Sequence, residues 1–144
     1  MTSPDEPTGG STPFHTVLVV DDEILERLAI CAYLRECGFR VIEAVNTDEA
    51  LFALQQPKLN IDIVLSDVEM AGSLDGLGLA RWVREHKPGL PIILAATPER
   101  AADVAGNLCE DGPLLTKPYD PQILLDQIRR TLANAAAASN KGNE

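Results

Sequence analysis

The sequence predicts an α/β fold, a doubly wound (βα)5 arrangement with a five-stranded parallel sheet. Short apolar runs alternate five times with segments of helical spacing, which is the pattern of strands joined through helices. Such connections are right-handed, so helices should cover both faces of the sheet. Charged residues follow three of the apolar runs, and ligands of open parallel sheets bind beyond the carboxyl ends of the strands. A functional site is therefore expected at that edge.

Composition limits the chain to one domain and narrows its partners. Its 144 residues can bury one core but leave no room for a second globular unit. The net charge of −10, from 12 basic and 22 acidic residues, argues against a nucleic-acid or anionic-membrane surface. Residues 1–6 carry acids where a secretory signal needs basic residues, and no apolar run approaches a membrane span. We therefore expect a cytoplasmic protein with no membrane or nucleic-acid partner.

Both ends of the chain are predicted to lie outside the folded domain. Residues 1–15 are rich in Pro, Thr, Ser and Gly and should form a flexible leader. Residues 134–144 should form a frayed tail, although its alanines can extend the last helix. The domain is thus predicted to span residues 16–133, and no output domain is expected after it.

The first half of the domain is predicted to hold three strands and two helices. The strands are short, largely apolar runs bounded by turn residues, at 16–20, 39–44 and 61–67. A helix over residues 23–37 has apolar residues near helical spacing and stops before Gly38. The second helix is predicted to begin at Thr47 as N-cap, with acids in its first turn, and to end before Pro57.

The second half is predicted to hold two strands and three helices. The strands are expected at 91–96 and 114–116, and the first helix at 77–86. Thr97-Pro98 is typical of a helix start, so a short helix should run to about residue 105. The last helix should begin at Asp120-Pro121. Its inner face is marked by apolar residues at i, i+4 and i+8, namely Leu124, Ile128 and Leu132.

Three predicted strand ends carry residues suited to phosphoryl chemistry. Asp21 and Asp22 follow the first strand, Asp67 ends the third, and Lys117 follows the fifth. Asp22 and Asp67 form a pocket of hard oxygen ligands that suits Mg²⁺. A carboxylate nucleophile needs its phosphoryl target neutralised and held, for which Lys117 offers a mobile charge. Asp67 is therefore predicted to form an aspartyl phosphate.

Each of these residues also has an ordinary structural explanation. An acid pair at a helix start can complement the helix dipole, and a lone lysine or loop aspartate is usually solvated. The agreement of three independent strand ends favours the functional interpretation.

In these residues the chain resembles the receiver domain of bacterial two-component response regulators, of the chemotaxis-regulator type. The resemblance covers about residues 16–133. The matching segments are Val19-Val20-Asp21-Asp22-Glu23, Leu65-Ser66-Asp67-Val68-Glu69-Met70, Asp75-Gly76 and Thr116-Lys117-Pro118-Tyr119. It implies a flavodoxin-like sheet with strand order 2-1-3-4-5, since chemotaxis receivers are examples of that fold.

The resemblance also implies roles for individual residues. Asp67 would be the phosphoacceptor, Asp22 a direct Mg²⁺ ligand, Asp21 a ligand through water, and the backbone carbonyl of Glu69 a further ligand. Lys117 would contact the phosphoryl group, and its peptide bond to the following proline would be cis. The phosphodonor would be a sensor histidine kinase or a histidine phosphotransfer protein. A downstream protein would be the target, and the domain a monomer or weak homodimer.

Two positions depart from the receiver pattern. Receivers usually carry Ser or Thr at the end of the fourth strand, where Ala96 stands here, with Thr97 one residue later. Thr97 would then cap the next helix, unless a local bulge re-aims it to contact the phosphoryl group. Leu114 stands where many members carry Tyr or Phe. The usual hydroxyl-and-aromatic switch is therefore expected to be missing.

Three functions follow from these observations. The first is a single-domain response regulator, which signals by protein contact or acts as a phosphate sink and does no catalysis beyond self-phosphorylation and autodephosphorylation. The second is a receiver-fold docking module that needs no phosphate, for which Ala96 and Leu114 are the arguments. The third is a haloacid-dehalogenase-like phosphatase. It fits less well, because that class needs two acids one residue apart on the first strand and a cap insertion.

Overall fold

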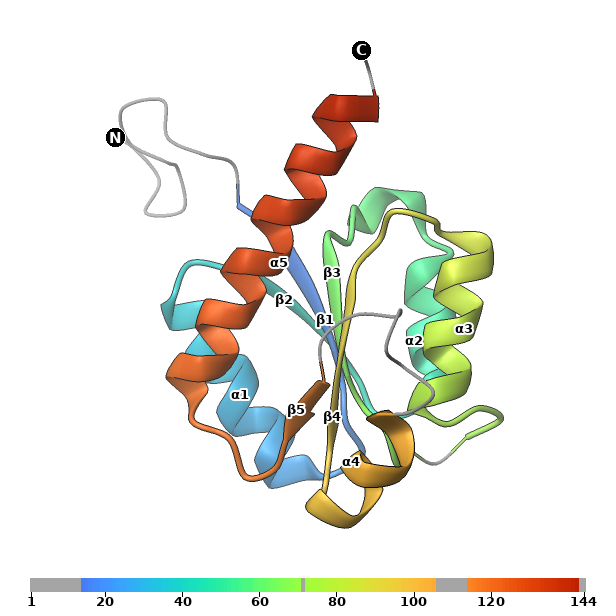
Figure 1. The fold of residues 1–144 in the computed structure, drawn as a ribbon, viewed down its shortest axis with the longest axis vertical. Helices are drawn as coiled ribbons and strands as arrows, with labels where there is room; N and C mark the ends of the chain where they lie inside the picture. Colours follow the sequence, from blue (N-terminus) through green and yellow to red (C-terminus); the bar gives the residue numbers. More distant parts are fainter. Residues whose placement is uncertain (1–13, 71, 106–113, 143–144) are drawn as a thin grey trace.

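The computed structural model describes residues 14–70, 72–105 and 114–142. Most of the predicted leader, residues 1–13, lies outside them. Five strands form one parallel sheet in the order β2-β1-β3-β4-β5, which confirms the predicted class and strand order (Figure 1). The strands are β1 (Thr16–Val20), β2 (Arg40–Ala44), β3 (Ile63–Asp67), β4 (Ile92–Ala96) and β5 (Leu114–Thr116).

Helices cover both faces of the sheet. They are α1 (Ile24–Glu36), α2 (Thr47–Leu54), the single 3₁₀ turn η2 (Pro57–Leu59), α3 (Gly76–His86), α4 (Pro98–Ala105) and α5 (Pro121–Gly142). Helices α1 and α5 lie on one face, and α2 and α3 on the other (Figure 1). Within the described residues, no helix combines the length and apolar character needed to cross a membrane.

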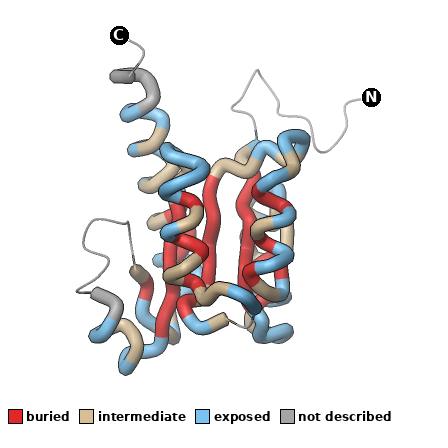
Figure 2. Tube along the Cα trace, turned by 90° about the vertical axis from the view of Figure 1, so that its right-hand side faces the viewer, coloured by how far each residue is buried: buried red, intermediate tan, exposed pale blue. Residues whose placement is uncertain are grey.

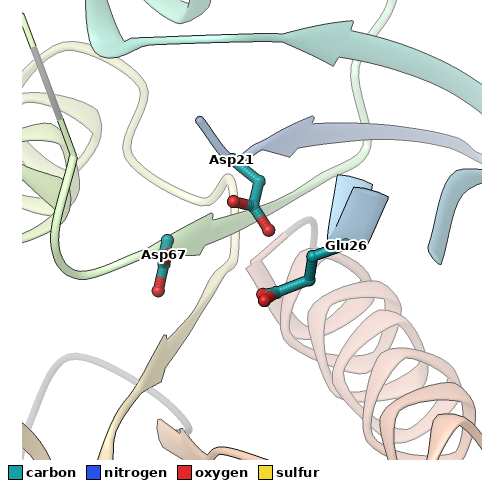
Figure 3. A group of neighbouring side chains, drawn as sticks. All are labelled: Asp21, Glu26 and Asp67. Carbon is teal, nitrogen blue, oxygen red and sulfur yellow. The ribbon is translucent and has the colours of Figure 1, made fainter. Parts of the chain in front are cut away.

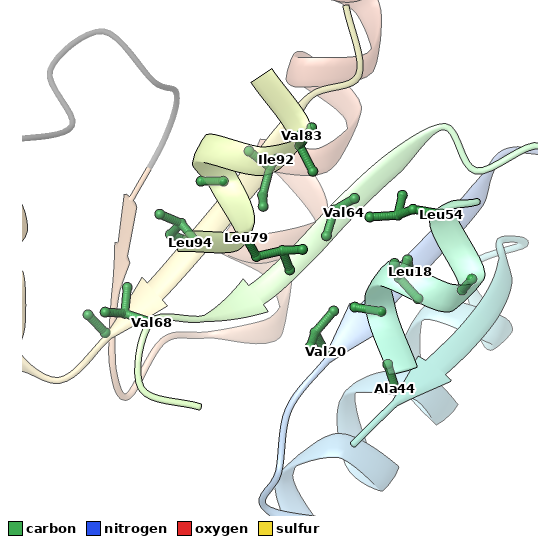
Figure 4. Packing of buried hydrophobic residues seen from close by; sticks show 14 residues of the cluster. Leu18, Val20, Ala44, Leu54, Val64, Val68, Leu79, Val83, Ile92 and Leu94 are labelled. Carbon is green, nitrogen blue, oxygen red and sulfur yellow. The ribbon is translucent and has the colours of Figure 1, made fainter. Parts of the chain in front are cut away.

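The two faces of the sheet bury two separate apolar clusters. Successive strand residues point to opposite faces, so Leu18 and Val64 join the cluster beneath α2 and α3, whereas Val19 and Leu65 join the one beneath α1 and α5. Strands β1, β3 and β4 form the buried centre of the molecule (Figure 2). Figure 4 shows the first cluster, in which Leu79 reaches the sheet from α3. Strands buried on both faces explain the continuous apolar runs of the sequence.

The start of α2 differs by one residue from the prediction. Asn46 is the N-cap, and its side chain accepts a hydrogen bond of 2.8 Å from the backbone N–H of Glu49. Thr47 is instead fully buried, and its hydroxyl donates to the carbonyl of Leu74 at 2.7 Å. Both side chains can cap a helix, and the tertiary bond to the loop before α3 decides between them.

The last helix is longer than predicted. Leu124 and Ile128 are fully buried against α1 and the sheet, which confirms the predicted inner face. Helix α5 continues through the alanines that we expected could extend it and on to Gly142, so residues 139–142 are helical where we expected a frayed end. The alanine run there has the highest intrinsic helix propensity and contains no helix breaker before that glycine.

Candidate functional site

The carboxyl ends of the strands bring the predicted site residues to one edge. Asp67 pairs in register with Ala95 of β4, and β1 is aligned beside β3 so that Asp21 leaves the sheet next to it. Lys117 follows β5 and donates its backbone N–H to the carbonyl of Ala96 at 2.8 Å. Its ammonium Nζ lies 2.9 Å from Oδ2 of Asp67. The structure thus joins residues 50 positions apart in the sequence.

Three carboxylates share this space. One oxygen from each of Asp21, Glu26 and Asp67 lies within 4.8 Å of the others, and the three side chains come from the end of β1, the first turn of α1 and the end of β3 (Figure 3). Sequence analysis did not single out Glu26. The available signal was its place one turn into a helix that begins directly after a strand ending in acids.

Asp22 and Glu69 are placed differently from these acids. Asp22 is exposed and does not belong to the group of carboxylates within 4.8 Å among the described residues. Its charge still acts on Asp67, whose pKa it helps to raise. The side chain of Glu69 is also exposed. The roles of Asp22 and of the Glu69 carbonyl as Mg²⁺ ligands therefore stay predictions.

Lys117 is held by two carboxylates at once. Its Nζ lies 2.6 Å from Oε1 of Glu26 and 2.9 Å from Oδ2 of Asp67. Burial acts to lower the pKa of Lys117, but the hydrogen bonds to these two acids outweigh it and raise the pKa. The lysine is therefore charged at neutral pH. The peptide bond from Lys117 to Pro118 is cis, as the resemblance implied.

Burial and crowding of like charges set the protonation of the acids. Burial raises the pKa of Asp21 to about 7, against a hydrogen bond of 2.9 Å that its Oδ1 accepts from the backbone N–H of Glu23. Burial likewise raises the pKa of Asp67, although Lys117 opposes it. For Glu26, hydrogen bonds with Lys117 and Asp21 outweigh burial and lower the pKa. A pocket in which one acid resists ionisation favours a bound cation.

Arg27 holds the backbone of Asp21 in place through a buried hydrogen bond. Its side chain is only 10% exposed, and its guanidinium donates to the backbone carbonyl of Asp21 at 2.8 Å and pairs with Glu43 of β2 at 3.1 Å. Arg35 pairs with the same glutamate from an exposed position. A bond to the Asp21 carbonyl fixes the backbone from which the carboxylate projects.

Gly76 packs directly against the backbone of Asp67. Its N–H donates to the carbonyl of Val68 at 2.8 Å, which draws the start of α3 against the end of β3. A Cβ at this position would overlap the backbone carbonyl of Asp67 and lie 2.7 Å from the Cα of Val68. Only glycine fits this approach without moving the strand end that carries the site.

A model of the response regulator receiver domain matches residues 17–129. The chain belongs to this family. Receiver domains are generally phosphoacceptors rather than enzymes, they interact with histidine kinases or phosphotransfer proteins, and they typically use Mg²⁺ at an acidic pocket.

Relatives and solved structures agree with this assignment. The transcriptional regulatory protein ResD of Bacillus subtilis is 32% identical over 123 residues, which are 85% of this chain and 50% of ResD. The transcriptional regulatory protein ZraR of Klebsiella oxytoca is 32% identical over 123 residues, 84% of this chain and 26% of ZraR. The chain thus spans half or less of the length of these two curated relatives. A response regulator receiver protein from Sinorhizobium medicae superposes with a TM-score of 0.78 at 28% identity, covering 87% of this chain and 99% of that one.

The buried residue at the end of β4 in this receiver domain is apolar. Ala96, at the end of β4, is almost fully buried and pairs in regular register with Thr116 of β5. Thr97 is exposed at the start of α4, and its hydroxyl accepts a long hydrogen bond of 3.4 Å from the N–H of Arg100. The regular pairing agrees with the direct alignment, in which Ala96 occupies the hydroxyl position, rather than with a bulge. Leu114 is half-buried in β5.

Proposed function

We propose that this receiver domain accepts a phosphoryl group on Asp67 from a sensor histidine kinase or a histidine phosphotransfer protein. The observation that carries the proposal is the contact of Lys117 with Asp67 inside a group of carboxylates at the carboxyl edge of the sheet. A lysine charge beside a largely shielded carboxylate is the arrangement that a nucleophilic aspartate needs to hold a phosphoryl group.

The donor set of the pocket fits Mg²⁺, which prefers carboxylate and carbonyl oxygens. Asp21, Asp22, Asp67 and the backbone carbonyl of Glu69 are the proposed ligands, and the ion would neutralise phosphoryl oxygens when bound. Burial raises the pKa of Asp21 to about 7, because the ionised carboxylate is costly without a nearby positive charge. A bound cation would supply that charge. Glu26 brings a further carboxylate to the same space.

The chain's own residues perform the transfer as follows. One carboxylate oxygen of Asp67 forms a bond to phosphorus while the bond from phosphorus to the donor histidine nitrogen breaks, and that nitrogen keeps the electron pair. Lys117 holds a phosphoryl oxygen as charge develops on it. The product is an aspartyl phosphate. No hydroxyl from Ala96 is available to bind a second oxygen, and we assign no such contact to the exposed Thr97.

We further propose that the signal passes to a downstream protein, or that the domain drains phosphate from another regulator. The net charge of −10 supports a protein partner over a nucleic acid. A docking role without phosphate is the alternative that Ala96 and Leu114 suggest. The retained contact between Lys117 and Asp67 favours the phosphoacceptor instead.

Intact-mass spectrometry tests the proposal. Incubation with acetyl phosphate and Mg²⁺ should add the mass of one phosphoryl group, stable in acid and labile in base, and Asp67→Asn should abolish the addition. Asp126→Asn, an exposed aspartate on α5, is the matched control and should be phosphorylated like the wild type. Absence of any addition would favour the docking module, and multiple turnover of phosphate esters would favour a phosphatase.

A further inference from the structure

Lys117 has a shorter ion pair with Glu26 than with the proposed phosphoacceptor. Its Nζ lies 2.6 Å from Glu26 and 2.9 Å from Asp67. The side chains of Lys117 and Asp67 are 18% and 13% exposed and that of Glu26 is 34% exposed, so the pair with Glu26 is shielded from bulk water mainly on the lysine side. A shielded, charge-assisted hydrogen bond is stronger than one on an open surface. The lysine is therefore engaged by Glu26 before any phosphoryl group arrives.

A pocket of about 430 Å³ opens beside the site and is lined by Glu26, Lys117 and Thr97 together with the apolar side chains of Ile30 and Tyr119 on its wall. Glu26 belongs to the first turn of α1, which is anchored in the core through Ile30 and, one residue after Glu26, through the buried Arg27. The helix thus holds the Glu26 carboxylate beside Lys117 at the edge of this pocket.

We infer that Glu26 is a positioning residue that engages Lys117 and thereby lowers the affinity of Asp67 for a phosphoryl group. This inference rests on the proposed function of Asp67. A phosphoryl group on Asp67 needs the same ammonium group that Glu26 holds at 2.6 Å. The lysine must also turn from Glu26 toward a phosphoryl oxygen, so the ion pair of the unmodified domain opposes the reaction.

The chemistry with acetyl phosphate makes the competition explicit. A carboxylate oxygen of Asp67 bonds to phosphorus as the bond from phosphorus to the acetate oxygen breaks, and acetate leaves with the electron pair. In that step Lys117 donates hydrogen bonds to the phosphoryl oxygens, and Glu26 loses Lys117 as its hydrogen-bond donor. Glu26→Gln keeps the size of the side chain and removes its charge, which should weaken the competition.

The test compares Glu26→Gln with Glu36→Gln, a glutamate at the exposed far end of the same helix. At saturating Mg²⁺, Glu26→Gln should be phosphorylated by acetyl phosphate roughly threefold to tenfold faster and should bind beryllofluoride, a phosphoryl mimic, tighter by a similar factor. Glu36→Gln should match the wild type in both measurements. If Glu26→Gln only damaged the fold, the variant would instead be phosphorylated more slowly than the wild type and would have a lower melting temperature.

A double-mutant cycle with Lys117→Met shows whether Glu26 acts through the lysine. In the Lys117→Met background, Glu26→Gln should leave the phosphorylation rate, followed by mass over hours, within twofold of that background. Acceleration that persists there would overturn the inference, as would wild-type rates in Glu26→Gln. A weaker Mg²⁺ affinity with an unchanged rate at saturation would also overturn it, because Glu26 would then be a metal ligand. If the wild type itself takes up no phosphoryl group while Asp67 is intact, the proposed function fails instead.

Discussion

The two walls of the pocket differ in what they can do with a phosphoryl group. On the β1 and α1 side, Asp21, Glu26 and Arg27 form a connected set of charges that reaches Lys117 and Asp67. On the β4 side, the buried Ala96 belongs to the apolar cluster beneath α2 and α3, and the exposed Thr97 lines the pocket beside Lys117. The first wall supplies the proposed metal ligand Asp21, whereas its Glu26 engages the lysine that a phosphoryl group would need. The second lacks, at Ala96, the hydroxyl through which a receiver usually couples phosphorylation to loop movement.

Disrupting the close approach of Gly76 to Asp67 should have the largest effect on the free energy of unfolding. Gly76→Ala should lower the free energy of unfolding by about 3 kcal/mol, because the added methyl overlaps the Asp67 carbonyl and must push the strand end aside. The same displacement should reduce phosphorylation by acetyl phosphate. Urea denaturation and intact-mass spectrometry measure the two losses.

Gly78→Ala is the matched control for that substitution. Its Cβ would lie 3.1 Å from side-chain atoms of Leu74 and 3.5 Å from Oδ1 of Asp75, with no backbone atom among its nearest contacts, and alanine is favoured over glycine inside a helix by up to about 1 kcal/mol. We expect its stability to stay within about 1 kcal/mol of the wild type. Equal losses in Gly76→Ala and Gly78→Ala would show that helix packing, not the support of Asp67, limits this region.

The buried ion pair of Arg27 should contribute more to stability than the exposed ion pair of Arg35. Arg27→Met should cost about 2 kcal/mol, because it leaves Glu43 half-buried without its inner partner and frees the Asp21 carbonyl. Arg35→Met removes the exposed partner of the same glutamate and should cost no more than about 0.5 kcal/mol. Thermal and urea unfolding check both values. Similar losses in the two variants would mean that the buried network adds nothing beyond a surface ion pair.

The contrast between the walls also explains which features could be predicted from sequence. Asp21, Asp67 and Lys117 were found because each ends or follows a strand, and parallel register alone brings strand ends to one edge. Glu26 and Arg27 lie on a helix, where the direction of a side chain depends on how α1 rotates and packs against the sheet. That rotation is fixed by Ile30 and Leu34 in the core, which no local pattern places relative to the pocket. The capping of α2 by Asn46 instead of Thr47 was missed for the same reason, since the deciding bond is to the distant Leu74.

The acidic wall should make the metal-free domain less stable as the pH rises. The pKa of Asp21 is raised from 3.8 to about 7, so the folded state binds this proton more tightly than the unfolded chain does. Between about pH 4 and pH 7 the unfolded state has released the proton while the folded state keeps it, and the free energy of unfolding falls as the pH increases. Above pH 7 the full cost of the ionised Asp21 is present.

Asp21→Asn isolates that effect. Without Mg²⁺ the variant should be more stable than the wild type by about 1–2 kcal/mol above pH 7 and should lose most of the slope between pH 4 and pH 7. Saturating Mg²⁺ should reverse the order, because a cation favours the ionised carboxylate. An unchanged slope in the variant would assign the pH dependence to another group.

The β4 side of the pocket should respond least in stability but selectively in phosphoryl binding. Ala96→Ser adds a hydroxyl at the position where receivers usually carry one, so beryllofluoride should bind roughly threefold to tenfold tighter, the effect of one added hydrogen bond. Thr97→Ala removes the hydroxyl and the γ-methyl group at the start of α4, should cost no more than about 1 kcal/mol, and should leave beryllofluoride affinity unchanged. If Thr97→Ala weakens that affinity and Ala96→Ser has no effect, the hydroxyl that binds the phosphoryl mimic is that of Thr97. The β4 side of the pocket would then also contribute a polar contact to the phosphoryl group.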